Sequence, residues 1–252
     1  MLASSRVRTL IVVLAFSLGS GVGAYGATTA GDPVDEVLKQ RPTANPSRIQ
    51  HVKQLIAESQ GHPRILELRL FHTGQLMGVS RDPQHFRSLI EQLRKLAGDA
   101  GDRTRLAFTA QIRIGTIYQH CLKDSPAAYA HYKTMEKHPS LAGKELETDY
   151  RRMSLYVRIA QAALGHPVRK FDEVEKYTRL VMAYPHLGMT DRKMYRKFYE
   201  LYEEAGRLYL TAFGQDPDKL CSIEVYPSHP RLFRWREEAL TKALEHKPEK
   251  GE

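Results

Sequence analysis

The sequence lacks the short motifs that mark the common enzyme classes. It contains no phosphate-binding loop, no Gly-x-Ser-x-Gly turn, no Cys-x-x-Cys-His haem motif and no cysteine pairs at zinc-binding spacing. We therefore expect a protein that is not an enzyme, with no catalytic residue and no cofactor. An envelope hydrolase whose active site is assembled only by the fold is the alternative.

Histidine is abundant, but it lacks a metal-binding pattern. None of the 11 histidines belongs to a His-Glu-x-x-His motif. Four stand directly before proline, at His62, His138, His166 and His229. This places them at helix ends and turns, where the helix dipole and free carbonyl groups favour a histidine. We expect these capping roles rather than a metal site.

Long apolar runs are also missing. The N-terminal run Thr9–Leu18 has 10 residues, whereas a membrane span needs about 20. Two arginines precede this run and small residues follow it, which is the order found in a secretory signal peptide. The sequence predicts a signal peptide over residues 1–24, cleaved near Ala24 or Gly26, and a periplasmic or secreted protein. An uncleaved segment would instead anchor the chain in the membrane.

The charge does not indicate a nucleic-acid partner. The net charge is +9, but acidic and basic residues alternate along most of the chain and no RNA- or DNA-binding motif is present. The only asparagine, Asn45, precedes Pro46, which excludes N-glycosylation. Residues 25–46 are poor in apolar side chains and contain three prolines. We expect a flexible linker there and one folded domain over residues 47–248.

Strand patterns are absent, and a helical repeat takes their place. Apolar residues recur every three or four positions, which is typical of helices. Equivalent leucines follow one another at intervals of 45, 46 and 45 residues, and a proline stands two residues before three of them. These residues are Leu96, Leu141, Leu187 and Leu232, with Pro139, Pro185 and Pro230. We expect an all-α fold of helix-turn-helix units over about residues 63–96, 97–141, 142–187 and 188–232, closed by a capping helix over residues 231–246.

The units resemble tetratricopeptide repeats (TPR). That family combines a small residue and a tyrosine three positions later with an alanine, an aromatic residue and a closing proline. One unit contains Gly115, Tyr118, Ala128, Tyr132 and Pro139, and a later one repeats the 24-residue Gly-to-Pro distance with Gly206, Tyr209 and Pro230. The period exceeds the family's 34 residues, and a HEAT-like array is the structural alternative. The resemblance implies an α-solenoid in which neighbouring units bury each other's apolar faces.

Five basic residues mark the candidate binding surface. They are Arg105, Arg151, Arg152, Arg196 and Lys197. They occupy equivalent positions of successive long helices, and the resemblance implies that these helices line a concave, peptide-binding face. Such cations suit a protein partner with an acidic peptide segment. A solvated face, with the cations paired to Glu147 and Asp149, is the alternative.

These observations predict an exported helical-repeat scaffold or adaptor that binds other proteins in the cell envelope. A membrane-anchored assembly factor with the same solenoid is a further alternative. The protein would contact the membrane only in that case, through its uncleaved N-terminal segment.

The row of helix pairs also sets expectations for packing. Cys121 and Cys221 fall two units apart, which is roughly 20 Å for helices packed 8–10 Å apart, whereas a disulfide needs Cα atoms within about 7 Å. We expect two thiols rather than a disulfide. Gly115 and Gly206 should let the two helices of a pair approach closely. The predicted core includes Ile114, Ile117, Leu155, Leu180 and Leu208.

Overall fold

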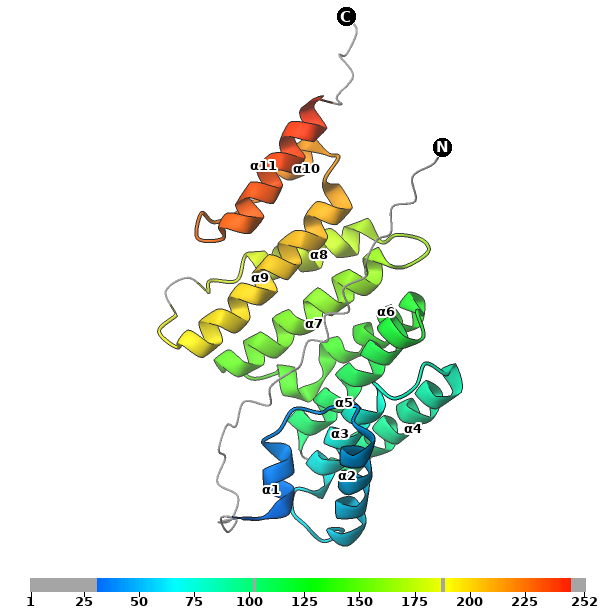
Figure 1. Ribbon diagram of the computed structural model, residues 1–252. Helices are drawn as coiled ribbons and strands as arrows, with labels where there is room; N and C mark the ends of the chain where they lie inside the picture. Colours follow the sequence, from blue (N-terminus) through cyan, green and yellow to red (C-terminus); the bar gives the residue numbers. More distant parts are fainter. Residues whose placement is uncertain (1–30, 102, 187–188, 246–252) are drawn as a thin grey trace, which may run out of the picture. The chain divides into compact units, whose positions relative to one another are not determined.

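The structure is a computed structural model that describes residues 31–101, 103–186 and 189–245. Every regular element in this part of the chain is helical, which confirms the predicted all-α class. The helices form two compact units, the first ending at Val79 and the second starting at Ser80 (Figure 1). The predicted signal peptide, residues 1–24, and its cleavage sites lie outside the described residues.

The first unit contains α1 (Pro33–Leu38), α2 (Pro46–Glu58) and α3 (Ile65–Leu76). Helix α1 lies within the segment that the sequence predicts as a linker. It forms there because Asp32 accepts hydrogen bonds from the first-turn N–H groups and Pro33 occupies the first helical position. Val34 and Val37 are buried in a small core with apolar residues of α2 and α3.

Two polar contacts tie α1 to the turn before α3. His62 Nε2 lies 3.0 Å from the Asp32 carboxylate, and the Arg64 guanidinium lies 2.5 Å from Asp35. The segment from α1 onward is therefore an integral part of the first unit.

The second unit contains seven longer helices and a shorter one within the described residues. They are α4 (Pro83–Asp99), α5 (Thr104–Thr116), α6 (Ser125–Thr134), α7 (Leu146–Leu164), α8 (Phe171–Met182), α9 (Arg192–Phe213), α10 (Pro217–Cys221) and α11 (Pro230–Glu245). A π-helical turn, η1 (Ile117–Cys121), continues α5, and the short 3-10 helices η2 (Met135–Lys137) and η3 (Pro139–Leu141) follow α6.

Three of these helices begin at an aspartate–proline or aspartate–serine–proline start that the sequence predicts. Asp82, Asp124 and Asp216 each accept a hydrogen bond from an N–H two or three residues later, at 2.9 to 3.1 Å. Proline has no backbone N–H group. In the first turn this costs no hydrogen bond, because the first N–H groups of a helix have no partner inside the helix. The apolar pattern predicts a longer helix after Asp216, but α10 ends at Cys221.

Each helix of the second unit packs on the next one in the chain, from α4 to α11. The pairs α5–α6, α7–α8 and α9–α10 occupy the predicted units 97–141, 142–187 and 188–232. Helix α7 also packs on α9, and α9 packs on α11, so these three helices lie side by side in chain order (Figure 1). The predicted unit 63–96 is divided, because the boundary between the compact units falls after Val79.

The two predicted contact glycines both meet a neighbouring helix closely. A Cβ on Gly115 would lie 2.2 Å from the ring of Tyr132, on the second helix of its own pair. A Cβ on Gly206 would lie 2.3 Å from Leu232, which belongs to α11. Gly206 therefore brings α9 close to the capping helix, and the prediction that it serves its own pair is wrong.

Four of the five predicted core residues are buried. Ile114, Ile117 and Leu155 are 0% exposed, and Leu208 is 6% exposed. Leu180 is 44% exposed, so its prediction as a core residue is wrong. It is on α8, whose buried residues include Tyr177 and Val181, and at 100° per residue Leu180 falls outside the arc that they occupy.

Candidate binding surface

Three cations from three long helices surround one carboxylate. Glu147 lies 3.2 Å from Arg105 of α5, 3.4 Å from Arg151 of α7 and 3.6 Å from Lys197 of α9. We call these four residues the Glu147 cluster. Since the three cations are 46 residues apart in sequence, the cluster joins equivalent places in three successive helix pairs.

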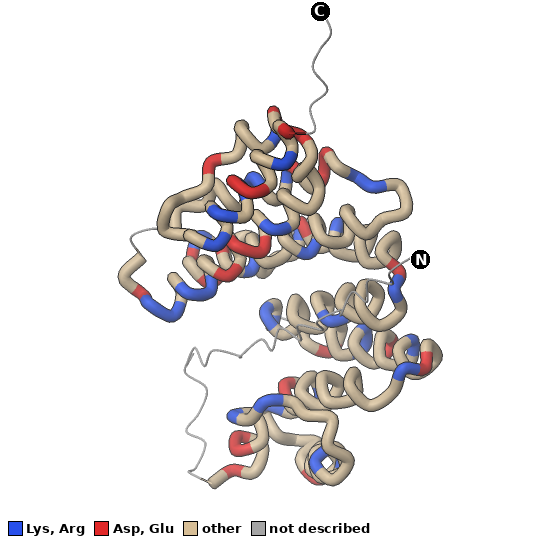
Figure 2. Tube along the Cα trace, turned by 45° about the horizontal axis from the view of Figure 1, so that its top comes forward, with Lys and Arg blue, Asp and Glu red and all other residues tan. Residues whose placement is uncertain are grey.

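The Glu147 cluster carries more positive than negative charge. Burial lowers the pKa of Arg151, the neighbouring Arg105 lowers it further, and Glu147 and Glu145 oppose both effects. Elsewhere on the second unit, basic and acidic residues are interspersed (Figure 2). Arg105 is 46% exposed and Glu147 is 38% exposed, so the carboxylate and one of its cations are open to solvent.

Two of the three cations are held in place by further contacts. Arg151 donates a hydrogen bond from Nη2 to Thr148 Oγ1 at 2.7 Å and another from Nε to the carbonyl of Ser140 at 3.3 Å. Lys197 Nζ lies 4.9 Å from the centre of the Tyr150 ring, within the range of a cation–π interaction. These contacts reduce the side-chain entropy that a ligand would have to remove.

The other two predicted site residues do not join the cluster. Arg152 pairs with Asp149 at 2.6 Å and donates to the carbonyl of Leu141 at 2.7 Å, so it braces the turn before α7. Arg196 pairs with Glu200 on its own helix and is 83% exposed. The solvated-face alternative describes Arg196 well. It also correctly names Asp149 as the partner of Arg152 and Glu147 as a partner of the remaining cations.

Aromatic residues of the long helices contribute to packing. Phe198 and Tyr202 are buried. Phe198 stacks on Tyr184 with ring centres 4.7 Å apart and meets Tyr150 edge-on at 5.8 Å. These rings fix the spacing of α7 and α9 behind the Glu147 cluster.

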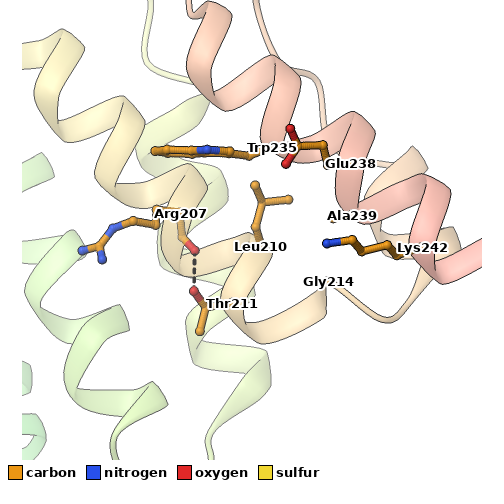
Figure 3. Close-up of a pocket in the computed structure, with 8 residues that line it drawn as sticks. All are labelled: Arg207, Leu210, Thr211, Gly214, Trp235, Glu238, Ala239 and Lys242. Carbon is orange, nitrogen blue, oxygen red and sulfur yellow. Dashed lines mark hydrogen bonds between the residues drawn. The ribbon is translucent and has the colours of Figure 1, made fainter. Parts of the chain in front are cut away.

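A shallow groove separates α9 from α11. It has a volume of about 320 Å³ and is lined by Arg207, Leu210, Thr211, Gly214, Trp235, Glu238, Ala239 and Lys242 (Figure 3). The indole of Trp235 lies across its α11 side and is 37% exposed. The groove exists only while α11 is packed on α9.

Three of the four histidines that precede proline cap a turn. His62, His138 and His166 each accept, through Nδ1, a hydrogen bond from the N–H two residues later, at 3.1 to 3.2 Å. They lie at helix ends and turns as predicted, but they accept from N–H groups, whereas the sequence suggested contacts with free carbonyls. The fourth, His229, differs: its Nε2 lies 2.8 Å from Nε2 of His186.

Both cysteines are free thiols in the structure, with Cys221 exposed and Cys121 partly buried. Burial raises the pKa of Cys121, which lowers the reactivity of this thiol at neutral pH. No group of three or more metal-ligating side chains occurs among the described residues. No helix in the described part is long and apolar enough to cross a membrane.

Comparison with known proteins finds no matching family model, no matching curated protein and no matching solved structure.

Two features of this surface escaped prediction from sequence. Glu147 was expected only as a local partner of the arginines, not as the centre of three helices. The contact between His186 and His229 was not expected, although each residue adjoins one of the repeat prolines, Pro185 and Pro230. His186 follows its proline and His229 precedes its proline, so the only available signal was that both histidines adjoin equivalent prolines.

Proposed function

We propose that this protein is an exported, TPR-like adaptor that binds an acidic segment of a partner protein at the Glu147 cluster. The observation that carries the proposal is the convergence of three cations on one half-exposed carboxylate. The three cations belong to three different helix pairs, so the distances within the cluster depend on how the pairs stack.

The TPR-like part of the proposal is supported by the glycine contact in the α5–α6 pair. Gly115 meets Tyr132, and both residues belong to the motif on which the resemblance depends. The charged helix α11 then covers the end of the row, as a capping helix would.

An acidic peptide fits the Glu147 cluster for two reasons. The cluster has an excess of cations, and its nitrogen–oxygen separations of 3.2 to 3.6 Å exceed the 2.7–2.9 Å of a strong charge-assisted hydrogen bond. A carboxylate of the partner can therefore approach Arg105 and Lys197 more closely than Glu147 does. Arg151, held by Thr148 and Ser140, would keep its position as the ligand binds.

The test measures binding of a fluorescein-labelled ten-residue peptide of alternating glutamate and alanine by fluorescence anisotropy. Arg105→Gln combined with Lys197→Gln should weaken binding about 10-fold or more, because a hydrogen bond to a charged group contributes about 1.5–3 kcal/mol. Glu147→Gln should strengthen binding, because it removes the competing carboxylate.

The matched control is Arg196→Gln, which removes the same charge from the position next to Lys197 but outside the cluster. It should leave the affinity within about twofold, since an exposed ion pair contributes little. Equal weakening by Arg196→Gln and Lys197→Gln would show that only net charge matters, and the proposed site would be wrong.

Export is tested by N-terminal sequencing of the protein recovered from its producing cells. A chain that starts at Tyr25 or Ala27 supports export with cleavage of the signal peptide. A chain that still starts at Met1 and stays with the membrane supports the anchored assembly factor instead.

A further inference from the structure

A buried pair of histidines joins the segment after α8 to the start of α11. His186 and His229 are 1% and 0% exposed, and their Nε2 atoms lie 2.8 Å apart. His229 directly precedes Pro230, the first residue of α11. The contact thus links two segments that are 43 residues apart in the chain.

The surroundings of the pair fix which nitrogen carries a proton. His186 Nδ1 lies 3.1 Å from the carbonyl oxygen of Tyr184, so Nδ1 donates and Nε2 of the neutral ring accepts. His229 must then donate from Nε2. Its own Nδ1 is a bare acceptor, and it is buried without a hydrogen-bond partner.

Tyrosine rings enclose His229. The centres of the Tyr199 and Tyr202 rings lie 4.1 Å from the imidazole centre, in stacked orientations. Tyr202 is held by its hydroxyl, which donates to the carbonyl of Glu224 at 3.3 Å and accepts from the N–H of Tyr226 at 3.2 Å.

The charged groups around the pair do not compensate an added proton. From α9, Glu203 lies beside the Tyr199 hydroxyl, and from α11 Arg231 lies near the same hydroxyl. Glu224 lies near Tyr202. The pKa of His229 is lowered to about 4, first by burial and then by His186, with no opposing contribution from these carboxylates. The rings of Tyr195, Tyr199, Tyr202 and Tyr226 complete the surroundings of the pair.

Helix α11 is attached by few other buried contacts. Of its 16 residues only Leu232 and Ala243 are buried. Arg236 adds a hydrogen bond to the carbonyl of Leu220 at 3.0 Å. An element with so few buried apolar contacts can open by itself while the rest of the domain stays folded.

We propose that the His186–His229 pair is an acid-sensitive contact that holds α11 on α9 at neutral pH and releases it when the pair is protonated. A proton on His186 Nε2 would place two N–H groups face to face and abolish the hydrogen bond. A proton on His229 Nδ1 would create a buried cation whose new N–H has no acceptor. Either event favours the open arrangement, in which both rings reach water and the groove between α9 and α11 no longer exists.

The direction with pH follows from linkage. A histidine whose pKa is lower in the docked state binds fewer protons there than in the open state. Docking is therefore strongest above about pH 6.5, and its equilibrium constant falls about 10-fold per pH unit as the pH drops towards 4. The fall over that whole range is about 300-fold.

The test uses the fluorescence of Trp235, which is the only tryptophan of the chain and lies on α11. The full-length protein is titrated from pH 7.5 to 4.5, with far-UV circular dichroism recorded in parallel. We expect the emission to change within this range while most of the helical signal is kept. His229→Phe removes the imidazole that binds the proton but keeps an aromatic ring between the two tyrosines. This variant should abolish the change in emission. His51→Gln, at an exposed histidine of α2, is the control and should leave it intact.

A second measurement keeps the test independent of how well the variant folds. Hydrogen exchange of the wild-type protein, corrected for the intrinsic effect of pH on exchange, should show protection of α11 falling about 10-fold per pH unit relative to α7. Unchanged Trp235 emission down to pH 4.5, the same transition in His229→Phe, or parallel protection of α11 and α7 would each overturn the proposal.

Discussion

The contact between Gly115 and Tyr132 allows a sharp test of how α5 and α6 pack. An alanine at position 115 would place its Cβ 2.2 to 2.8 Å from three ring atoms of Tyr132. That ring is 0% exposed, so it has no open space into which to move. The substitution forces either the ring off its rotamer or the two helices apart.

The magnitude follows from two opposing effects. Overpacking a buried site costs about 1–3 kcal/mol, and the rigid ring places Gly115→Ala towards the upper end of that range. Alanine favours the helix over glycine by about 1 kcal/mol. We expect a net loss of about 2 kcal/mol in the free energy of unfolding, measured by urea denaturation of the full-length protein and followed by circular dichroism.

Gly98→Ala is the matched control, because Gly98 lies inside α4 and a Cβ there meets nothing within 4 Å. It should stabilise by about 1 kcal/mol through helix propensity alone. In a Tyr132→Ala background the clash is gone, so Gly115→Ala should become neutral or stabilising. If Gly115→Ala is as stable as Gly98→Ala, the close approach of α5 and α6 is refuted.

Three further predictions concern the second unit. Gly206→Leu should destabilise it by about 1–3 kcal/mol, because the new side chain overlaps a buried residue of α11; a melting temperature within a degree or two of wild type would contradict this. Tyr177→Phe removes the hydroxyl that donates to Glu136 at 2.5 Å, and urea denaturation should show a loss of about 1–3 kcal/mol. Under native conditions a chromogenic disulfide reagent should label Cys221 quickly and Cys121 slowly, because Cys221 is exposed and burial raises the pKa of Cys121. Equal rates, or no thiol at all, would argue against the packing around Cys121.

Helix starts were predictable because their cause is local. Asp82, Asp124 and Asp216 each stand just before a proline-containing first turn, and a side-chain oxygen needs only the next few residues to act as a cap. Helix α1 was missed for the opposite reason. Its segment is poor in apolar residues, and the burial of Val34 and Val37 depends on α2 and α3, which no local pattern reveals.

The histidines show the same division between local and distant causes. The capping contacts of His62, His138 and His166 span two residues each, so their place at turns could be predicted from the proline that follows. His229 precedes a proline as well, but its partner His186 is on another segment. The local rule gave the correct location and missed the contact.

The Glu147 cluster shows how finely a repeat spacing has to be known before it identifies a site. Successive residues of a helix point 100° apart, so a spacing of 45 rather than 46 residues turns a side chain to a different face. Arg196 lies 45 residues after Arg151 and is 83% exposed beside Glu200, whereas Lys197 lies 46 residues after it and reaches Glu147. The leucine repeat alternates between 45 and 46 residues and permits both choices. Only the packing of α9 on α7 decides between them, which is why comparing Arg196→Gln with Lys197→Gln is the most direct probe of that packing.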